Sequence, residues 1–224
     1  MKMINDSQSG AVRTEGRPVT IAVAGNPNAG KSTLINAIAG ARLHVGNWPG
    51  VTVEKKDASF NHRGRPVTLV DLPGTYSLSP YSQEEVIARD YLIRGRPDVI
   101  INVVDATNLE RNLYLTLQLL ELEIPLVLAL NVYDEAMDKG LRIDVASLSS
   151  LLGVPVVPTV ATKKKGTDDL VDAAVELAET PAGIGREPVQ YDGGIEEAIG
   201  RTLGGLEADA SETLEGLPRR WLAI

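Results

Sequence analysis

The 224-residue chain has no cysteine, one phenylalanine and no long hydrophobic run. Without cysteine there is no disulfide framework, no thiolate metal site and no cysteine nucleophile, which suits a reducing cytosol. The longest apolar stretches, "DVIINVVDA" and "IPLVLALNV", are much shorter than the roughly 20 residues that a transmembrane helix needs. The polar first 17 residues also lack the apolar core of a signal peptide. The sequence therefore predicts no membrane span among these residues.

Positive charge is also scarce, since 22 lysines and arginines face 30 aspartates and glutamates, for a formal net charge of −8. This balance disfavours a broad nucleic-acid or anionic-lipid surface, so any phosphate has to be bound locally. The basic run "TKKKG" at 162–166 is interpreted as solvated. A content of 43% hydrophobic and 23% charged residues is typical of a globular protein with one α/β domain and a smaller appendage.

Short β-branched runs alternate with segments of helical period, which predicts a mainly parallel sheet of six to seven strands covered on both faces. Asn61–Gly64 has the composition of a hairpin turn, so "VEKKDASF" (53–60) is expected to form an antiparallel edge strand. The other strands are expected at 19–25, 67–73, 99–105, 124–131 and 154–159, and helices at 31–39, 83–94, 110–122, 144–152 and 167–179.

Three regions follow from the change of composition along the chain. Residues 1–17 are expected to form a flexible tail and residues 18–181 the α/β domain. Beyond a stretch rich in glycine and proline, residues 182–224 show helical patterns without strands, which predicts a small all-helical subdomain. The apolar, uncapped end "WLAI" indicates that the chain is truncated before a further segment, expected to be a membrane region.

A phosphate-binding loop follows the first strand. "GNPNAGKS" (25–32) fits the pattern G-x-x-x-x-G-K-[ST] between a buried strand and a helix, which predicts a P-loop fold. Its backbone N–H groups and the helix N-terminus can hold phosphate, Lys31 can bridge the β- and γ-phosphates, and Ser32 can ligate Mg²⁺. The alternative is a glycine-rich turn without a ligand. The expected nucleotide contacts here are Gly25, Asn26, Pro27, Asn28, Ala29, Gly30, Lys31, Ser32 and Thr33.

Three further strand ends are expected to complete a guanine nucleotide site. Asp71 is expected near the metal ion, and Gly74 can offer its N–H to the γ-phosphate. Asn131, Val132 and Asp134 follow another strand, where a carboxylate suits the N1–H and 2-amino donors of guanine and has no matching donor in adenine. A turn that only closes the strand is the alternative. Ala161 or Thr162 is expected to bind the guanine oxygen.

These motifs resemble the N-terminal cytosolic region of the FeoB ferrous-iron transporter family, in which a GTPase domain and a helical domain precede a membrane part. The resemblance covers about 20–224 and rests on "GNPNAGKSTLINA", "VGNWPGVTVE", "DLPGTYSLSPYSQEE" and "LPRRWLAI". It implies a GTPase fold for the α/β domain and GTP or GDP as the bound nucleotide.

The resemblance also implies roles for single residues. "VGNWPGVTV" (45–53) matches switch I, so Gly50, Val51 and Thr52 are expected at the nucleotide, with Thr52 joining Ser32 and Asp71 as a Mg²⁺ ligand. Asn28 matches the K⁺-binding asparagine of potassium-stimulated GTPases, with carbonyls of Gly46 and Trp48 as further K⁺ ligands. From chemistry alone, Asn28 is equally well explained as a turn residue. The expected catalytic set is Asn28, Lys31, Thr52 and Gly74.

Three positions depart from the wider GTPase pattern. Thr75 replaces the glutamine that orients water in Ras-like enzymes, which predicts slow hydrolysis. Val132 stands where many GTPases have lysine, and Val160 where many have serine, which predicts weakly held, rapidly exchanging nucleotide. Trp48 is expected to be partly exposed without nucleotide.

Two functions remain open from the sequence. The first is a slowly hydrolysing GTPase that regulates ferrous-iron uptake at the cytoplasmic side of the bacterial inner membrane. Its expected partners are its own C-terminal transmembrane region and small cytosolic Feo proteins, with self-association through the helical subdomain open and no nucleic acid. The alternative is a potassium-stimulated or translation-factor-like GTPase that acts on RNA or ribosome assembly.

Overall fold

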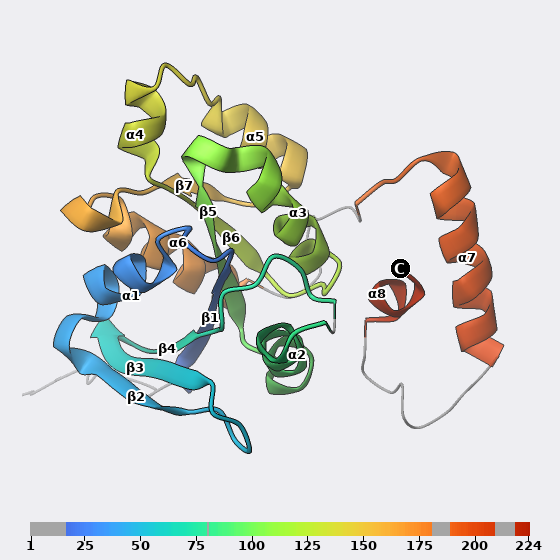
Figure 1. Cartoon of the computed structure of the whole chain (residues 1–224), viewed down its shortest axis with the longest axis horizontal. Helices are drawn as coiled ribbons and strands as arrows, with labels where there is room; N and C mark the ends of the chain where they lie inside the picture. The colour runs from blue at the N-terminus through green and yellow to red at the C-terminus, as the bar shows by residue number, and fades with distance from the viewer. Residues whose placement is uncertain (1–16, 80, 181–188, 209–217) are drawn as a thin grey trace, which may run out of the picture.

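A seven-stranded sheet forms the centre of the molecule in the computed structural model, which describes residues 17–79, 81–180, 189–208 and 218–224 (Figure 1). The strand order is β2-β3-β4-β1-β5-β6-β7. All neighbouring pairs are parallel except β2 with β3 and β3 with β4. The strands are β1 (Val19–Gly25), β2 (Leu43–Asn47), β3 (Glu54–His62), β4 (Arg65–Asp71), β5 (Val99–Asp105), β6 (Leu126–Asn131) and β7 (Val156–Pro158).

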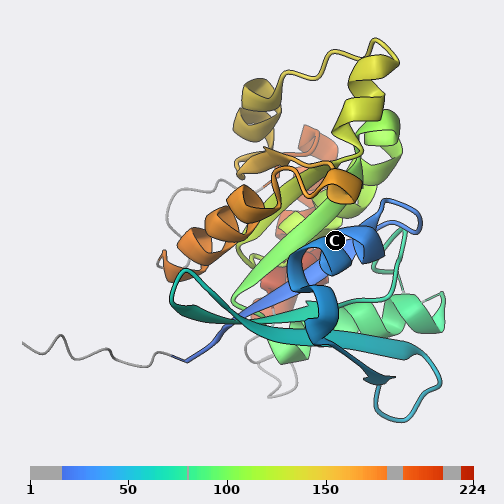
Figure 2. The same cartoon turned by 90° about the vertical axis from the view of Figure 1, so that its left-hand side faces the viewer.

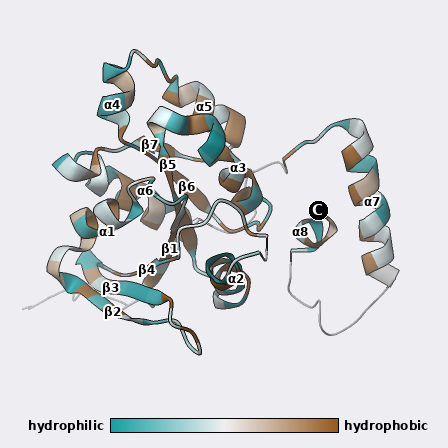
Figure 3. Cartoon of the chain, in the orientation of Figure 1, coloured by the Kyte–Doolittle hydropathy of each residue, from teal (hydrophilic) through white to brown (hydrophobic). Residues whose placement is uncertain are grey.

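The helices cover both faces of the sheet, because the central strands carry apolar side chains on both sides. One face packs against α1 (Lys31–Ala39) and α6 (Thr167–Glu179). The other packs against α2 (Gln83–Asp90), α3 (Leu109–Leu120), α4 (Tyr133–Asp138) and α5 (Val145–Leu152). The central strands are coloured mostly as hydrophobic in Figure 3, whereas the helices carry both hydrophobic and hydrophilic residues. The predicted mainly parallel α/β fold is confirmed.

The predicted position of the antiparallel strand at the edge is wrong. β3 runs antiparallel to its neighbours, but β2 lies outside it and pairs Gly46 with Lys55. β2 comes from the segment that was interpreted as the switch I loop, whose glycines and exposed side chains hide the strand pattern. In Figure 2 this hairpin projects from the lower part of the molecule (Figure 2).

Trp48 is buried rather than partly exposed, with 7% of its surface accessible. Its ring meets Tyr91 edge to face at a centroid distance of 5.3 Å, and the Lys55 ammonium lies 5.6 Å from its centroid. Trp48 belongs to the core on the α2 and α3 face. Trp48 lies in a polar stretch of the sequence, so its burial could not be predicted from the neighbouring residues. The burial depends on packing against Tyr91, which is distant in sequence.

Most predicted helices lie within a few residues of their expected bounds, and α6 matches its range. The sequence analysis missed the short helix α4, which follows Asn131 and Val132 directly. The tail at 1–16 and the proposed domain boundary at 181–182 lie outside the described residues. No helix in the described part of the chain is long and apolar enough to cross a membrane.

Two helices follow the α/β part, α7 (Gly193–Ala208) and α8 (Arg219–Ala223). Arg220 of α8 joins them to α3: its guanidinium bonds Glu196 at 2.7 and 3.0 Å, Glu121 at 3.2 Å and the Val189 carbonyl at 2.7 Å. The Tyr191 hydroxyl donates to the buried Glu121 carboxylate at 3.1 Å. Burial, followed by the charge of Glu121, raises the pKa of Tyr191 to about 12. This polar cluster holds α8 against the end of α3.

The Arg220 cluster predicts an acid-dependent loosening of α8. Hydrogen bonds from Arg220 are the main cause that lowers the pKa of Glu196 from 4.5 to about 2. A carboxyl group with a lowered pKa in the folded state contributes stability above its unfolded pKa, and this contribution is lost as the pH falls from 4.5 towards 2. Arg220→Met should therefore loosen α8 most at pH 7, with a difference from the parent protein that shrinks below about pH 4.5.

Fluorescence of Trp221 in a Trp48→Phe background measures this loosening, because these are the two tryptophans of the chain and Trp221 packs against the core. Arg219→Met, which changes the exposed neighbouring arginine, is the matched control. Equal acid profiles for the two variants would contradict the role of Arg220.

Candidate nucleotide-binding site

Four loops gather at one edge of the sheet, because the parallel strands β1, β4, β6 and β7 all end there. The loops are 25–30 after β1, 72–79 after β4, 131–134 after β6 and 159–166 after β7. They carry all the predicted nucleotide contacts except those of residues 45–53, Asp71 at the end of β4, and Lys31, Ser32 and Thr33, which open α1. The site can therefore be built from contacts between neighbouring strand ends.

The loop between β1 and α1 has the shape of a phosphate cradle. Gly30 has φ +84°, and a Cβ at this position would lie 2.3 Å from Asn131 Nδ2. Asn28 also has a left-handed backbone, with φ 68°, which asparagine tolerates better than most residues. The loop closes by a hydrogen bond from Ala29 N to Asn26 O at 3.2 Å. The nine-residue helix α1 starts at Lys31, so its free N–H groups adjoin this loop.

The Lys31 ammonium forms a buried ion pair with the Asp71 carboxylate. Burial raises the pKa of Asp71, while the charges of Lys31 and Lys56 act in the opposite direction. The pair joins the start of α1 to the end of β4 and keeps two buried charges compensated. Both residues were predicted as nucleotide-site residues, and the structure brings them into contact.

The loop after Asp71 lies against the phosphate loop. A Cβ added at Gly74 would lie 3.3 Å from Pro27 Cα, so a larger residue would crowd this close approach by a few tenths of an ångström. Thr75 N donates to Gly25 O at 3.3 Å, and the Thr75 residue is buried. Further along, Leu78 N donates to the Gln118 side chain of α3 at 2.7 Å. Gly74 thus lies beside Pro27 of the phosphate loop, and the donation of its N–H to the γ-phosphate stays a prediction.

Asn131 connects three of the four loops through its side chain. Its Nδ2 donates to Ala29 O at 3.0 Å, and its Oδ1 accepts from Ala161 N and from Thr159 Oγ1, both at 3.2 Å. The residue is 2% exposed. The amide therefore fixes the phosphate loop relative to the segment that was predicted to read the base. The sequence analysis missed Thr159, whose position at the end of a strand was its only signal.

Val132 and Asp134 follow at the start of α4. Val132 has φ 57°, an uncommon backbone conformation for a β-branched residue, and it begins the helix without a side-chain cap. The Asp134 carboxylate accepts from Lys163 Nζ at 2.7 Å and from Glu135 N at 3.0 Å. The hydrogen bond from Lys163 is the main cause that lowers the pKa of Asp134. Asp134 is thus ionised, as a guanine-reading group must be.

Residues 45–53 comprise the end of β2 (45–47) and the turn that connects β2 to β3 (48–53). Trp48 N donates to Val53 O at 2.9 Å, and Val51 N donates to Trp48 O at 3.2 Å. Gly50 has φ +77°, and Thr52 is exposed. The predicted K⁺ ligand Trp48 O is therefore already an acceptor within this turn. Thr33 and Ser32, the latter predicted to bind Mg²⁺, are exposed in the first turn of α1, and Thr162 is exposed beside Ala161.

One polar side chain of the phosphate loop has no partner within the described chain. Asn26 is 3% exposed, and both its Oδ1 and its Nδ2 are buried without a hydrogen bond. An unpaired buried amide costs free energy, so a group that supplies both a donor and an acceptor would stabilise the loop. Water or a hydrated ligand has this chemistry, which agrees with a loop built to receive one.

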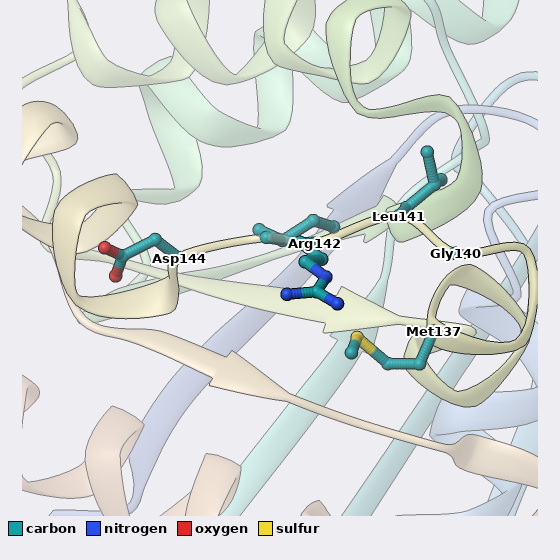
Figure 4. Close-up of a pocket in the computed structure, with 6 residues that line it drawn as sticks. Met137, Gly140, Leu141, Arg142 and Asp144 are labelled. Carbon is teal, nitrogen blue, oxygen red and sulfur yellow. The ribbon is translucent and has the colours of Figure 1, made fainter.

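A separate hollow of about 580 Å³ lies between α4 and α5, lined by Met137, Gly140, Leu141, Arg142, Ile143 and Asp144 (Figure 4). None of the predicted site residues lines it. The hollow contains a single arginine and a single carboxylate, and Asp144 already caps α5 through Ser147 N at 3.0 Å. The convergent polar groups of the four loops, rather than this hollow, make the candidate site.

Comparison with known proteins identifies relatives over most of the chain. Residues 19–174 match the family model of ferrous iron transport protein B. An Fe(2+) transporter FeoB from Salmonella choleraesuis is 47% identical over 212 residues, which are 93% of this chain and 27% of that protein. A Porphyromonas gingivalis fusion of Fe(2+) transport protein A and FeoB is 44% identical over 215 residues, covering 95% and 25%. The chain thus spans about a quarter of the length of these curated relatives.

Solved structures agree with this family and with the fold. The cytosolic domain of the T. maritima FeoB iron transporter in a second GDP form has a TM-score of 0.86 at 40% identity, covering 92% of this chain and 80% of that one. Its GMPPNP form has a TM-score of 0.84 at 41% identity, with 92% and 79% covered. The similarity therefore includes proteins solved with guanine nucleotides.

The contacts of Asn131 predict a large loss of stability in Asn131→Ala. The truncation leaves Ala29 O, Ala161 N and Thr159 Oγ1 without their shared partner, which should lower the free energy of unfolding by about 2–4 kcal/mol. Urea denaturation measures the change. Asn36→Ala at an exposed position of α1 is the control and should stay within about 0.5 kcal/mol of the parent. A similarly small change in both variants would contradict the central role of Asn131.

Proposed function

The chain belongs to the ferrous iron transport protein B family, and we propose that it binds guanine nucleotide and slowly hydrolyses GTP to GDP and phosphate. The observation that carries the proposal is the Asn131 side chain, which joins the phosphate loop at Ala29 to the base loop at Ala161. A nucleotide binds with its phosphates at one loop and its base at another. The Asn131 amide is hydrogen-bonded to both of these loops. We place the GTPase domain at 18–181 and the helical subdomain at 182–224.

The phosphates are bound by the backbone of residues 25–30 and by the first turn of α1, where N–H groups and the helix dipole favour negative charge. Lys31 leaves Asp71 and turns to the β- and γ-phosphates, because a phosphate oxygen offers it stronger compensation than one carboxylate. Gly74, held close to Pro27, donates its N–H to the γ-phosphate. Loss of that phosphate then frees residues 74–79.

The residues present fit Mg²⁺, since Ser32, Thr52 and Asp71 supply the hydroxyl and carboxylate oxygens that this hard cation prefers. When bound, Mg²⁺ neutralises charge on the phosphates. Ser32 and Thr52 are both exposed, and Asp71 becomes available once Lys31 turns away. Thr52 and neighbouring Gly50 and Val51 lie in a hairpin turn that closes over the γ-phosphate.

Asn28, Gly46 and Trp48 supply the neutral oxygens that suit K⁺, which would take the place of an arginine finger in phosphoryl transfer. The left-handed backbone of Asn28 is compatible with this role, because it is an exposed residue of the phosphate loop. The Trp48 carbonyl accepts from Val51 N, so one of its two lone pairs remains for an ion. Hydrolysis is slow because Thr75, a buried short side chain, stands where other GTPases have glutamine.

Coupling of the nucleotide state to ferrous-iron uptake is the proposed biological role. It rests on the relatives, which are named Fe(2+) transporters, and places this chain at the cytoplasmic side of the inner membrane beside its own transmembrane region. The fusion of Fe(2+) transport protein A with FeoB in Porphyromonas gingivalis supports a small FeoA-like protein as a partner. Self-association through the helical subdomain belongs to the same proposal.

Asp134→Asn tests the guanine site. The wild-type protein should bind GDP and show little ADP binding, because only guanine offers two donors to the carboxylate. Asp134→Asn should weaken GDP binding about 100-fold, since it removes charge-assisted hydrogen bonds and places an amide donor against the guanine donors. Asp138→Asn, at an exposed position of the same helix, is the control for the lost charge. Calorimetry that finds equal GDP and ADP affinities would refute the base assignment.

Asn28→Gly tests the potassium site without straining the loop, because glycine adopts the left-handed backbone of Asn28 freely. Wild-type GTP hydrolysis should be faster in KCl than in NaCl, on the order of tenfold or more. Asn28→Gly should remove this difference and retain GDP binding. Steady-state phosphate release in the two salts measures the effect, and equal rates for the wild-type protein would count against a K⁺ site.

A further inference from the structure

The ion pair between Lys163 and Asp134 has a consequence for nucleotide exchange and base selectivity. We propose that Lys163 competes with guanine for the Asp134 carboxylate, so that it weakens nucleotide binding and reduces selectivity for the guanine 2-amino group. This inference rests on the proposed guanine site. It assigns a role to a basic run that the sequence analysis interpreted as solvated.

Both carboxylate oxygens of Asp134 are engaged within the chain. Lys163 Nζ lies 2.7 Å from Oδ2, and Glu135 N lies 3.0 Å from Oδ1. Guanine presents two donors, N1–H and the 2-amino group, and needs both oxygens. The backbone N–H of Glu135 belongs to α4 and stays in place, whereas the lysine is a long, flexible side chain. Each oxygen has a second lone pair, but the Lys163 ammonium offsets the negative charge at Oδ2, so guanine competes with Lys163 for hydrogen bonding at that oxygen.

Lys163 lies in the loop that is expected to meet the base. It ends the 3-10 turn η4 (Ala161–Lys163), whose first residue donates its N–H to Asn131. The backbone of this loop is fixed by hydrogen bonds between Val160 and Lys165 and by Gly166, where a Cβ would lie 2.2 Å from Pro158 O. Because the backbone is held, binding of the base displaces the Lys163 side chain and leaves the turn intact.

The Lys163–Asp134 ion pair is exposed enough for guanine to displace the lysine from the carboxylate. The Lys163 side chain is 68% exposed and that of Asp134 is 31% exposed. The pKa of Lys163 is raised, chiefly by its hydrogen bond to Asp134, and that of Asp134 is lowered by the same contact, so both groups are charged when they meet. Breaking an exposed ion pair of this kind changes a binding constant by about two- to fivefold.

Inosine diphosphate separates this competition from a general effect of charge. Inosine retains the N1–H donor and lacks the 2-amino group, so it needs one carboxylate oxygen where guanine needs two. Removal of the lysine should therefore raise the affinity for GDP more than the affinity for IDP. If Lys163 acted only through the long-range field of its charge on the phosphates, its removal would change the affinities for GDP and IDP equally.

The experiment compares Lys163→Met with Lys165→Met, which removes the same charge two residues further along the exposed run. Calorimetry gives the Kd of GDP and of IDP for each protein in low salt and in 1 M salt. Lys163→Met should bind GDP about two- to fivefold more tightly than Lys165→Met, with a smaller change for IDP. The difference should shrink in 1 M salt, where the Debye length falls to about 3 Å.

Three results overturn the proposal. One is a Lys163→Met protein whose GDP-to-IDP affinity ratio equals that of Lys165→Met or of the parent. Another is weaker GDP binding in Lys163→Met than in Lys165→Met, which would mean that the lysine helps to hold the base. An Asp134→Asn background should abolish the effect of Lys163→Met, and a ratio change that persists there also refutes it. A parent protein that does not prefer GDP to ADP refutes the proposed function itself.

Discussion

The buried side chain of Asn131 is the constraint on which the site depends, because one amide contacts the phosphate loop and the base loop together. The Asn131 amide fits this position because residue 30 is a glycine, since a Cβ at Gly30 would lie 2.3 Å from Asn131 Nδ2. Thr159 adds a further donor to Oδ1 from the end of β7. The spacing between the two binding loops is thus set by packing between strand ends, before any ligand arrives.

The segments expected to sense the γ-phosphate are held by other contacts, on the α2 and α3 face. Trp48 packs on Tyr91, and Leu78 N binds Gln118 of α3. Glu121, directly after the last residue of α3, accepts hydrogen bonds from Tyr191 and Arg220. The contacts that fix the proposed binding loops are therefore separate from the contacts of the segments expected to sense the γ-phosphate. The loops fixed by Asn131 are the ones proposed to bind the nucleotide, while α3 lies between the loop after Gly74 and helix α8.

The fold and the loop motifs could be predicted because they depend on local patterns: buried apolar strands, a glycine-rich turn before a helix, and polar residues at strand ends. Strand β2 was missed because its exposed side chains and Gly46 carry no period, and its place depends on pairing with β3. The burial of Trp48 and the contact between Lys163 and Asp134 were missed for a related reason. Each joins residues far apart in sequence, and no single segment carries its signal.

The charged groups of the site already have partners within the chain. Lys31 is paired with Asp71, and Asp134 is paired with Lys163. Nucleotide binding on this view is an exchange of partners: phosphate replaces Asp71 at Lys31, and guanine replaces Lys163 at Asp134. Each exchange subtracts the free energy of the pair that it breaks from the free energy of binding. Charged groups that are already paired keep the site compensated without ligand, and the proposed exchange of partners predicts fast release of GDP.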